Sequence, residues 1–273
     1  MRTFCLILVL ITVTRVNAQH INRFMVVGDT HHYSPSPDFS QTIIYEITLA
    51  AIYEQVDFIF FTGDLAVRGF ASPMQEDSVL KDWRFMLDTL HYHNIKVFAC
   101  RGNNDFGNRE AWDSLFAGSY LLPQNGPGNE KNITYAIEYD NLLFIALDQY
   151  TAINKINQAW LDELLKNACR KFIFYAGHEP AFKLFNSNCL GAWPEERNRF
   201  WESLTNAGAK AYFCGHDHFY DHAIIDDGDG NSNNNVHQVI AGTGGASFFT
   251  DSKYNGDNGR WTPERLFHEE ATG

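Results

Sequence analysis

The sequence predicts a single α/β domain, and three observations support this. Short apolar runs rich in β-branched and aromatic residues recur along the chain, as in buried strands. Segments with helical periodicity lie between several of these runs, which is the rhythm of βαβ units. The 273 residues are 45% hydrophobic, enough for one large core, and no repeat or low-complexity linker divides them. We therefore expect one domain over residues 19–273.

Five apolar runs are interpreted as strands that lead into glycine-containing polar motifs. A glycine at this point lets the chain turn sharply off the strand. The runs cover residues 24–27, 58–62, 96–100, 172–176 and 211–214. Two further strands, 135–140 and 142–148, meet at Asp140 and Asn141, which is a signal for a tight hairpin.

Helices and loops are predicted between these strands. Helical periodicity covers residues 40–55, 82–92 and 157–168. It is clearest in the third segment, where Leu161 and Leu164 fall on the same apolar face. Pro194 favours the start of another helix because its fixed φ suits the first helical position. The Asn/Gly/Asp-rich segments 124–132 and 226–235 are predicted loops.

Side chains of metal-ligand type follow the five glycine-led strands. They are Asp29, His31, Asp64, Asn103, His178, His216 and His218. Ligands collect at the carboxyl ends of strands in open α/β sheets, so these side chains should converge. A single Asp or His after a strand usually caps a helix or a loop, but seven in five motifs favour a common site. Carboxylate, imidazole and amide donors without cysteine suit a catalytic Mn, Fe or Zn centre.

The five motifs resemble those of the calcineurin-like metallophosphoesterases. They read GDTH (28–31), GDL (63–65), GNN (102–104), GHEP (177–180) and GHDH (215–218). Within that superfamily the chain is most similar to the small purple acid phosphatases, which are tartrate-resistant acid phosphatase-like proteins, and to their non-purple relatives. The likeness runs from Phe24 to Ser247 and includes the glycine-rich AGTGG at 241–245. The resemblance implies a four-layer α/β/β/α sandwich with two mixed sheets.

The resemblance also implies the chemistry and the role of each ligand. One ion would be held by Asp29, His31 and His218, the other by Asn103, His178 and His216, with Asp64 bridging the two. The two ions, divalent or trivalent, would be Fe, Mn or Zn, and a metal-bridging hydroxide would attack small phosphate monoesters. The purple enzymes have a tyrosine ligand where this chain has Val67 and a glycine where it has His31, so the tyrosinate that colours them is missing.

The third motif departs from the family at Asn104. The family has a histidine here, which contacts phosphate and protonates the leaving group, followed by an acid that this chain keeps as Asp105. General acid assistance is typically worth ~10²- to 10⁴-fold in rate, so its loss weakens turnover. Asn104 and Asp105 are thus the candidate catalytic residues. Two alternatives stay open: a phosphodiesterase or nucleotide-directed hydrolase, and a catalytically weak metal-binding protein.

The two ends of the chain carry separate expectations. Residues 1–18 combine an early arginine, a short apolar run and a small residue at Ala18, which is the pattern of a cleaved signal peptide. We expect a secreted protein, extracellular or periplasmic, with no membrane attachment after cleavage. The sequence ends at HEEATG without a predicted final strand, so we expect a truncated C-terminus.

Charge and cysteine content limit the partners and the cross-links. The formal net charge is −12 and no basic stripe is present, which favours a small phosphate ester over nucleic acid. Oligomeric state is left open. Four cysteines remain after signal removal; Cys100 and Cys214 lie in predicted strands as core thiols, and a Cys169–Cys189 disulfide is expected.

Overall fold

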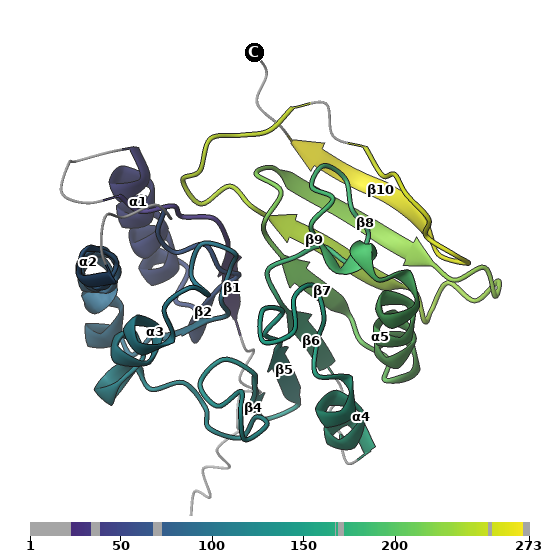
Figure 1. Ribbon diagram of the computed structural model, residues 1–273, viewed down its shortest axis with the longest axis horizontal. Helices are drawn as coiled ribbons and strands as arrows, with labels where there is room; N and C mark the ends of the chain where they lie inside the picture. The colour runs from purple at the N-terminus through teal and green to yellow at the C-terminus, as the bar shows by residue number, and fades with distance from the viewer. Residues whose placement is uncertain are drawn as a thin grey trace, which may run out of the picture.

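Two β-sheets pack face to face, and helices cover the outer surface of each (Figure 1). The structure is a computed structural model that describes residues 23–33, 39–67, 73–166, 168, 172–250 and 253–269. The expected four-layer α/β/β/α arrangement is therefore confirmed. The expected signal peptide, residues 1–18, lies outside the described residues.

The smaller sheet is built from the first half of the chain. Its strands are β1 (Phe24–Val27), β2 (Phe58–Phe61) and β3 (Lys96–Ala99), in that order and all parallel. Helices α1 (Phe39–Tyr53), α2 (Pro73–Tyr92) and α3 (Arg109–Leu115) lie on its outer side (Figure 1). The described strands of the smaller sheet therefore all run in one direction. The prediction of mixed sheets holds only for the larger sheet, which contains both parallel and antiparallel pairs.

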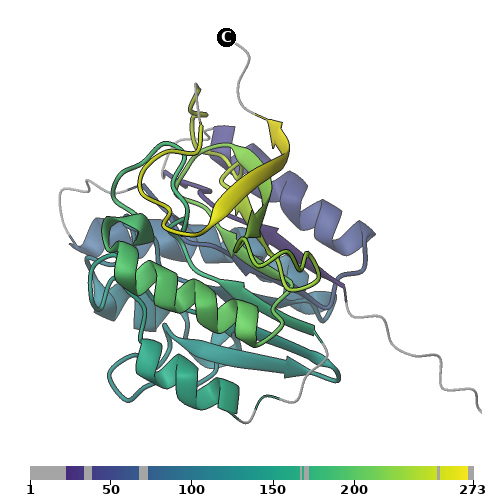
Figure 2. The ribbon, with the colours of Figure 1, turned by 90° about the vertical axis from the view of Figure 1, so that its right-hand side faces the viewer.

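The larger sheet has the order β10-β8-β9-β7-β6-β5-β4. Its strands are β4 (Tyr135–Tyr139), β5 (Leu142–Ala146), β6 (Phe172–Ala176), β7 (Ala211–Cys214), β8 (Tyr220–Asp226), β9 (Val236–Ala241) and β10 (Thr262–Glu269). β5, β6, β7 and β9 run parallel, while β4, β8 and β10 are antiparallel to their neighbours. Helices α4 (Gln158–Lys166) and α5 (Pro194–Asn206) cover its outer face, as Figure 2 shows.

Aromatic rings fill the space between the two sheets. Phe24 of β1 stacks on Phe58 of β2 at 5.2 Å between centroids and meets Phe144, Phe174 and Phe213 of the larger sheet edge to face. Edge-to-face pairs add roughly 0.5–1.5 kcal/mol each beyond the area that they bury. This packing fixes the two sheets against each other and so fixes the strand ends that carry the site.

The last strand corrects one expectation. β10 pairs with β8 at the edge of the larger sheet, so the chain does have a final strand where none was predicted. Buried Asp221 of β8 holds it in place, because its carboxylate accepts hydrogen bonds from Arg265 Nε at 2.7 Å and His268 Nδ1 at 3.0 Å. Pro263 is tolerated in this strand because an edge strand leaves backbone groups unpaired.

Two other features can be compared with the sequence predictions. Helix α2 begins at Pro73, earlier than the predicted 82–92, and the hairpin at Asp140 is confirmed with a φ of 43° at that residue. Cys189 is a buried free thiol, and Cys169, its expected disulfide partner, lies outside the described residues.

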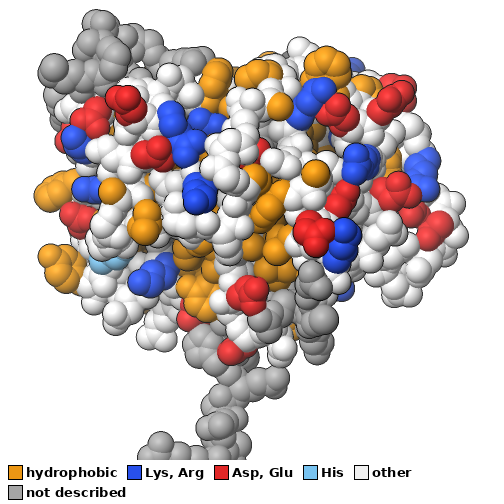
Figure 3. Space-filling view, turned by 60° about the horizontal axis from the view of Figure 1, so that its bottom comes forward, with side chains coloured by type: hydrophobic (Ala, Val, Ile, Leu, Met, Phe, Trp, Pro, Cys, Tyr) orange, Lys and Arg blue, Asp and Glu red, His pale blue; other side chains and the backbone are white. Residues whose placement is uncertain are grey.

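The surface is mixed in charge on the face that Figure 3 displays, where Lys and Arg side chains alternate with Asp and Glu side chains. Within the described residues, no helix has both the length and the apolar character needed to cross a membrane.

Candidate metal centre

All seven predicted ligands lie at the carboxyl ends of their strands, along the seam between the two sheets. The smaller sheet provides Asp29, His31, Asp64 and Asn103 after β1, β2 and β3, and the larger sheet provides His178, His216 and His218 after β6 and β7. Several ligand positions have left-handed backbone, with φ of 59° at Asp29, 52° at Asp64 and 69° at His216. Such conformations cost about 1–3 kcal/mol each in a residue other than glycine and concentrate at functional sites.

Two glycines allow the carboxylates to approach the backbone of neighbouring motifs. A Cβ at Gly102 would lie 2.8 Å from Asp64 Cγ and closer still to its Oδ1 and backbone N. A Cβ at Gly215 would lie 3.2 Å from Asp29 Cγ and closer to its Oδ2. The glycines therefore make room for the ligands of a neighbouring motif, in addition to turning the chain.

The first ligand cluster contains Asp29, His31 and His218. Asp29 Oδ1 lies 3.6 Å from His218 Nε2 and 4.0 Å from His31 Nε2, and the two imidazole rings meet edge to face at 4.7 Å. One ligand atom from each residue fits within 4.8 Å of the others. Ligands bonded to one Zn²⁺ at ~2.0–2.2 Å are separated by roughly 3–4 Å, so the cluster needs little adjustment to hold an ion.

The second ligand cluster is centred on His178. Its Nε2 lies 3.1 Å from Asn103 Oδ1, and its ring is 5.0 Å from that of His216. Asp64 lies between the two clusters, with Oδ2 at 3.2 Å from His31 Nε2 and Oδ1 at 3.6 Å from His178 Nε2. Asp64 therefore lies within reach of both clusters, and Asp29 also forms a group with Asp64 and His178 whose ligand atoms lie within 4.8 Å of one another.

Backbone carbonyls orient two of the imidazoles. His178 Nδ1 lies 2.8 Å from the Thr62 carbonyl oxygen, and His218 Nδ1 lies 2.9 Å from that of Ser247. A ring that donates its Nδ1 proton to a carbonyl presents an unprotonated Nε2 to the site, which is the form that binds a metal.

Burial favours neutral imidazoles in the metal-free site. It lowers the pKa of His216 to about 3, with a further contribution from His178, and that of His218 to about 4, with a further contribution from His31. Burial and the nearby Asp64 carboxylate raise the pKa of Asp29 well above its usual range. Burial opposes the charge on Asp64 too, but His178 and His31 lower its pKa below the usual range. Neutral imidazoles with an ionised carboxylate between them form a suitable ligand set for divalent ions.

Two buried polar atoms show that the residues fit a metal. Asp29 Oδ1 and His216 Nε2 are both buried without a hydrogen-bond partner. An unsatisfied buried polar group costs about 1–3 kcal/mol, and a cation bonded to these atoms would remove that cost. Both residues belong to the predicted ligand set, one to each cluster.

Asn104 and Asp105 take part in different contacts. Asn104 donates its backbone N–H to Asp64 Oδ1 at 2.7 Å and its side-chain amide to Asp64 Oδ2. Asp105 is buried and accepts hydrogen bonds from the backbone N–H groups of Gly102 at 2.8 Å and Leu65 at 3.1 Å. Burial and Asp64 raise the pKa of Asp105 to about 7. Asp105 thus holds the turns that carry two of the ligands.

Sequence reasoning missed the residues that support the ligands. Gln149 Oε1 accepts hydrogen bonds from the backbone N–H groups of His178 at 2.7 Å and Glu179 at 2.6 Å. Arg101 and Asp148 form a buried bidentate pair, with both nitrogen-to-oxygen distances at 2.8 Å, directly before Gly102. Asp148 and Gln149 also follow a strand, β5, but no glycine or histidine marks the motif, so their role was not visible.

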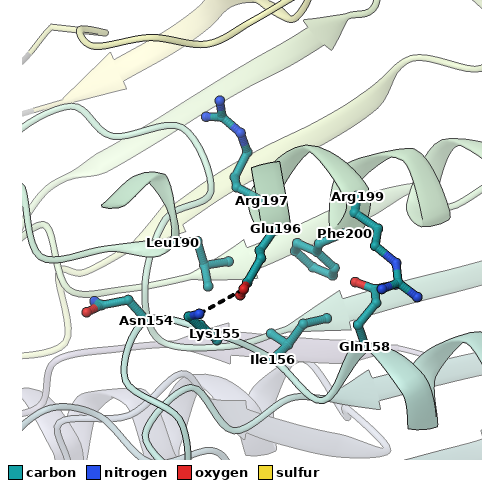
Figure 4. Close-up of a pocket in the computed structure, with 9 residues that line it drawn as sticks. All are labelled: Asn154, Lys155, Ile156, Gln158, Leu190, Glu196, Arg197, Arg199 and Phe200. Carbon is teal, nitrogen blue, oxygen red and sulfur yellow. Dashed lines mark hydrogen bonds and ion pairs between the residues drawn. The ribbon is translucent and has the colours of Figure 1, made fainter. Parts of the chain in front are cut away.

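A separate pocket of about 250 Å³ lies beside α5 (Figure 4). Two of its cations have acidic partners, since Lys155 Nζ lies 2.8 Å from Glu196 and Arg199 lies 2.6 Å from Asp162. Arg197 is turned away from Lys155 and donates to the Asp257 carbonyl at 2.9 Å. The pocket therefore differs in chemistry from the metal-ligand clusters.

The chain matches the model of one protein family. The profile of the calcineurin-like phosphoesterases matches residues 22–220, which include all seven ligands. The chain belongs to the calcineurin-like phosphoesterase family. The expected superfamily is therefore confirmed. The sequence has no significant match among curated proteins.

Solved structures share the fold at low sequence identity. Purple acid phosphatase PPD1 from yellow lupin (Lupinus luteus) seeds matches with a TM-score of 0.65 and 14% identity over 91% of this chain and 47% of its own, so this chain spans about half the lupin enzyme. GAP50, the anchor in the inner membrane complex of Plasmodium, matches with 0.60 and 17% over 90% and 77%. A dimetal phosphatase from Danio rerio matches with 0.56 and 12% over 80% and 86%.

Proposed function

We propose that the protein is a binuclear-metal hydrolase of small phosphate monoesters. The observation that carries the proposal is that Asp64 lies 3.2 Å from His31 of the first cluster and 3.6 Å from His178 of the second, while each cluster holds a buried atom without a hydrogen-bond partner. A pair of divalent ions, Fe, Mn or Zn, would supply charge to the phosphate and lower the pKa of an attacking water.

The residues of this chain have three tasks in that reaction. The oriented imidazoles keep their Nε2 atoms unprotonated at neutral pH, and Asp64 joins the two clusters. Asp105 fixes the turns at Gly102 and Leu65, so the ligands are held before substrate arrives. Preorganised groups of this kind lower the barrier because they need no rearrangement at the transition state.

Asn104 supports a second candidate, a metal-binding protein with little turnover. Its amide donates to Asp64, so it occupies a carboxylate oxygen that faces the ligands. An amide is also a poor proton donor for a leaving group, because a general acid works best with a pKa near the operating pH. The Plasmodium protein GAP50, described as an anchor, shows that this fold is not confined to proteins described as phosphatases.

The test measures metal content per chain together with hydrolysis of an aryl phosphate monoester and a diester, with Mn, Fe or Zn added. The first candidate predicts two ions and turnover that favours the monoester, both lost in Asp64→Ala. Asn104→His should raise kcat on esters of basic alcohols by about tenfold or more. Two bound ions without turnover in either the wild type or Asn104→His would favour the second candidate. Preference for the diester would favour a phosphodiesterase.

We also propose that the protein is exported and that residues 1–18 are removed. The basis is their short apolar run after an early arginine and before a small residue. N-terminal sequencing of the secreted product should begin at Gln19; retention of Met1 on cell-associated protein would contradict this.

A further inference from the structure

An aromatic ladder extends outward from the first ligand cluster, and it is formed by His31, His218, Phe249 and Phe185. Phe249 stacks on the His218 ring at 4.2 Å between centroids and 18° between planes. Phe185 stacks on Phe249 at 4.4 Å and 24°. Phe185 is 48% exposed, so it ends the ladder with an aromatic surface open to solvent.

The ladder is fixed to the same segment that carries two ligands. Asp217 lies between His216 and His218 and is fully buried. Its carboxylate accepts the backbone N–H groups of Phe185 at 3.2 Å and Asn186 at 3.0 Å. From the other side, Phe249 donates its backbone N–H to the His218 carbonyl at 3.0 Å. The exposed ring therefore has a defined position relative to the metal ligands.

We propose that Phe185 is the stacking platform for the base of a nucleoside phosphate, an inference that rests on the proposed function. A planar ring is the ligand group that best covers an exposed aromatic surface, and stacking of a base on a side chain tolerates different bases. Phe185 is two ring contacts from His218, so the ligand ring must be several bonds from phosphorus. A nucleoside phosphate meets this condition because the sugar separates base from phosphate, whereas a phenyl phosphate does not.

The experiment compares adenosine 5′-monophosphate with ribose 5-phosphate, which has the same ester but no base. It uses the full metal-loaded chain, the variant Phe185→Leu and the control Phe85→Leu. Phe85 is 75% exposed on α2, on the outer side of the other sheet, so its loss tests the effect of removing any surface ring.

The wild type should prefer the nucleotide, and Phe185→Leu should lower its kcat/KM by roughly 3- to 10-fold while leaving ribose 5-phosphate unchanged. Phe85→Leu should leave kcat/KM unchanged for both substrates. Equal rates on the two wild-type substrates, or an equal loss on both in Phe185→Leu, would overturn the inference. An equal loss on both substrates in Phe185→Leu would mean that Phe185 acts only by supporting His218 through Phe249.

Binding keeps the inference testable if no substrate is hydrolysed. Calorimetry with the methylene-bridged analogue of adenosine diphosphate should show weaker binding to Phe185→Leu than to wild type, and methylenediphosphonate alone should show no difference. A protein that binds the analogue through Phe185 but hydrolyses nothing would refute the proposed function and keep this inference. A protein that hydrolyses both esters at equal rates would support the proposed function and refute this inference.

Discussion

Replacing Gly102 by alanine should disrupt the centre at Asp64. The new Cβ would lie 2.8 Å from Asp64 Cγ and closer still to Oδ1 and the backbone N, against ordinary contacts of about 3.4 Å or more. Rotating the carboxylate cannot relieve the contact with the backbone, so the two turns must separate by a large part of an ångström. Asp64 lies between both clusters, so both would be displaced.

The expected magnitude follows from that displacement. A misplacement of about 1 Å in a catalytic centre costs on the order of 10²-fold in rate, and overpacking costs about 1–3 kcal/mol of stability. The assay is metal stoichiometry by mass spectrometry after dialysis, followed by kcat/KM on the best ester. The control is Gly128→Ala, because a Cβ at Gly128 meets nothing within 4 Å. If Gly102→Ala kept two tightly bound ions and wild-type activity, the steric argument would be refuted.

Two further predictions concern stability. Arg101→Ala leaves the buried Asp148 carboxylate unpaired, so thermal or urea unfolding should show a loss of about 3–5 kcal/mol, and a loss below 1 kcal/mol would show that the pair is not needed. The folded-state pKa values of about 3 for His216 and about 4 for His218 lie below the ordinary value near 6.5. The unfolded chain therefore takes up protons first as pH falls. In chelator, the contribution of these two imidazoles to stability should be full above about pH 6.5 and decline towards pH 4, while Asp29 and Asp105, whose pKa values are raised, contribute with the opposite sign. The measurement is an NMR titration of the two imidazoles in the folded protein, and protonation of either near pH 6.5 would contradict the burial of neutral imidazoles.

The sequence predicted the five strands that lead into the candidate ligands and the hairpin of β4 and β5, but not β8, β9 or β10. β1, β2, β3, β6 and β7 are apolar on both faces, and a glycine follows each soon after its end. β8 and β10 were not predicted because Asp221 and Arg265 interrupt their apolar pattern. Those two residues pair with each other across the strands, a contact that only the folded chain reveals. The first turns of α2 were missed for a related reason, since residues 73–81 are largely polar and show little helical stripe.

The site shows the same division between local and long-range information. The candidate ligands could be picked out because His216 and His218 stand two residues apart after a glycine, and the structure brings them close to the other candidate ligands. The contacts that surround the candidate ligands could not be predicted from the sequence. The Ser247 carbonyl that orients His218 is 29 residues away, and Asn104 could be seen as a departure but not as a donor to Asp64.

The position of the centre on the seam also has a mechanical consequence. The ligands before residue 105 come from the smaller sheet and those after residue 171 from the larger one, so each cluster joins the two halves of the chain. Two bound metal ions would act as a reversible cross-link between the two halves of the chain. The two sheets could then not separate without releasing metal, so metal loading should slow hydrogen exchange in both sheets together.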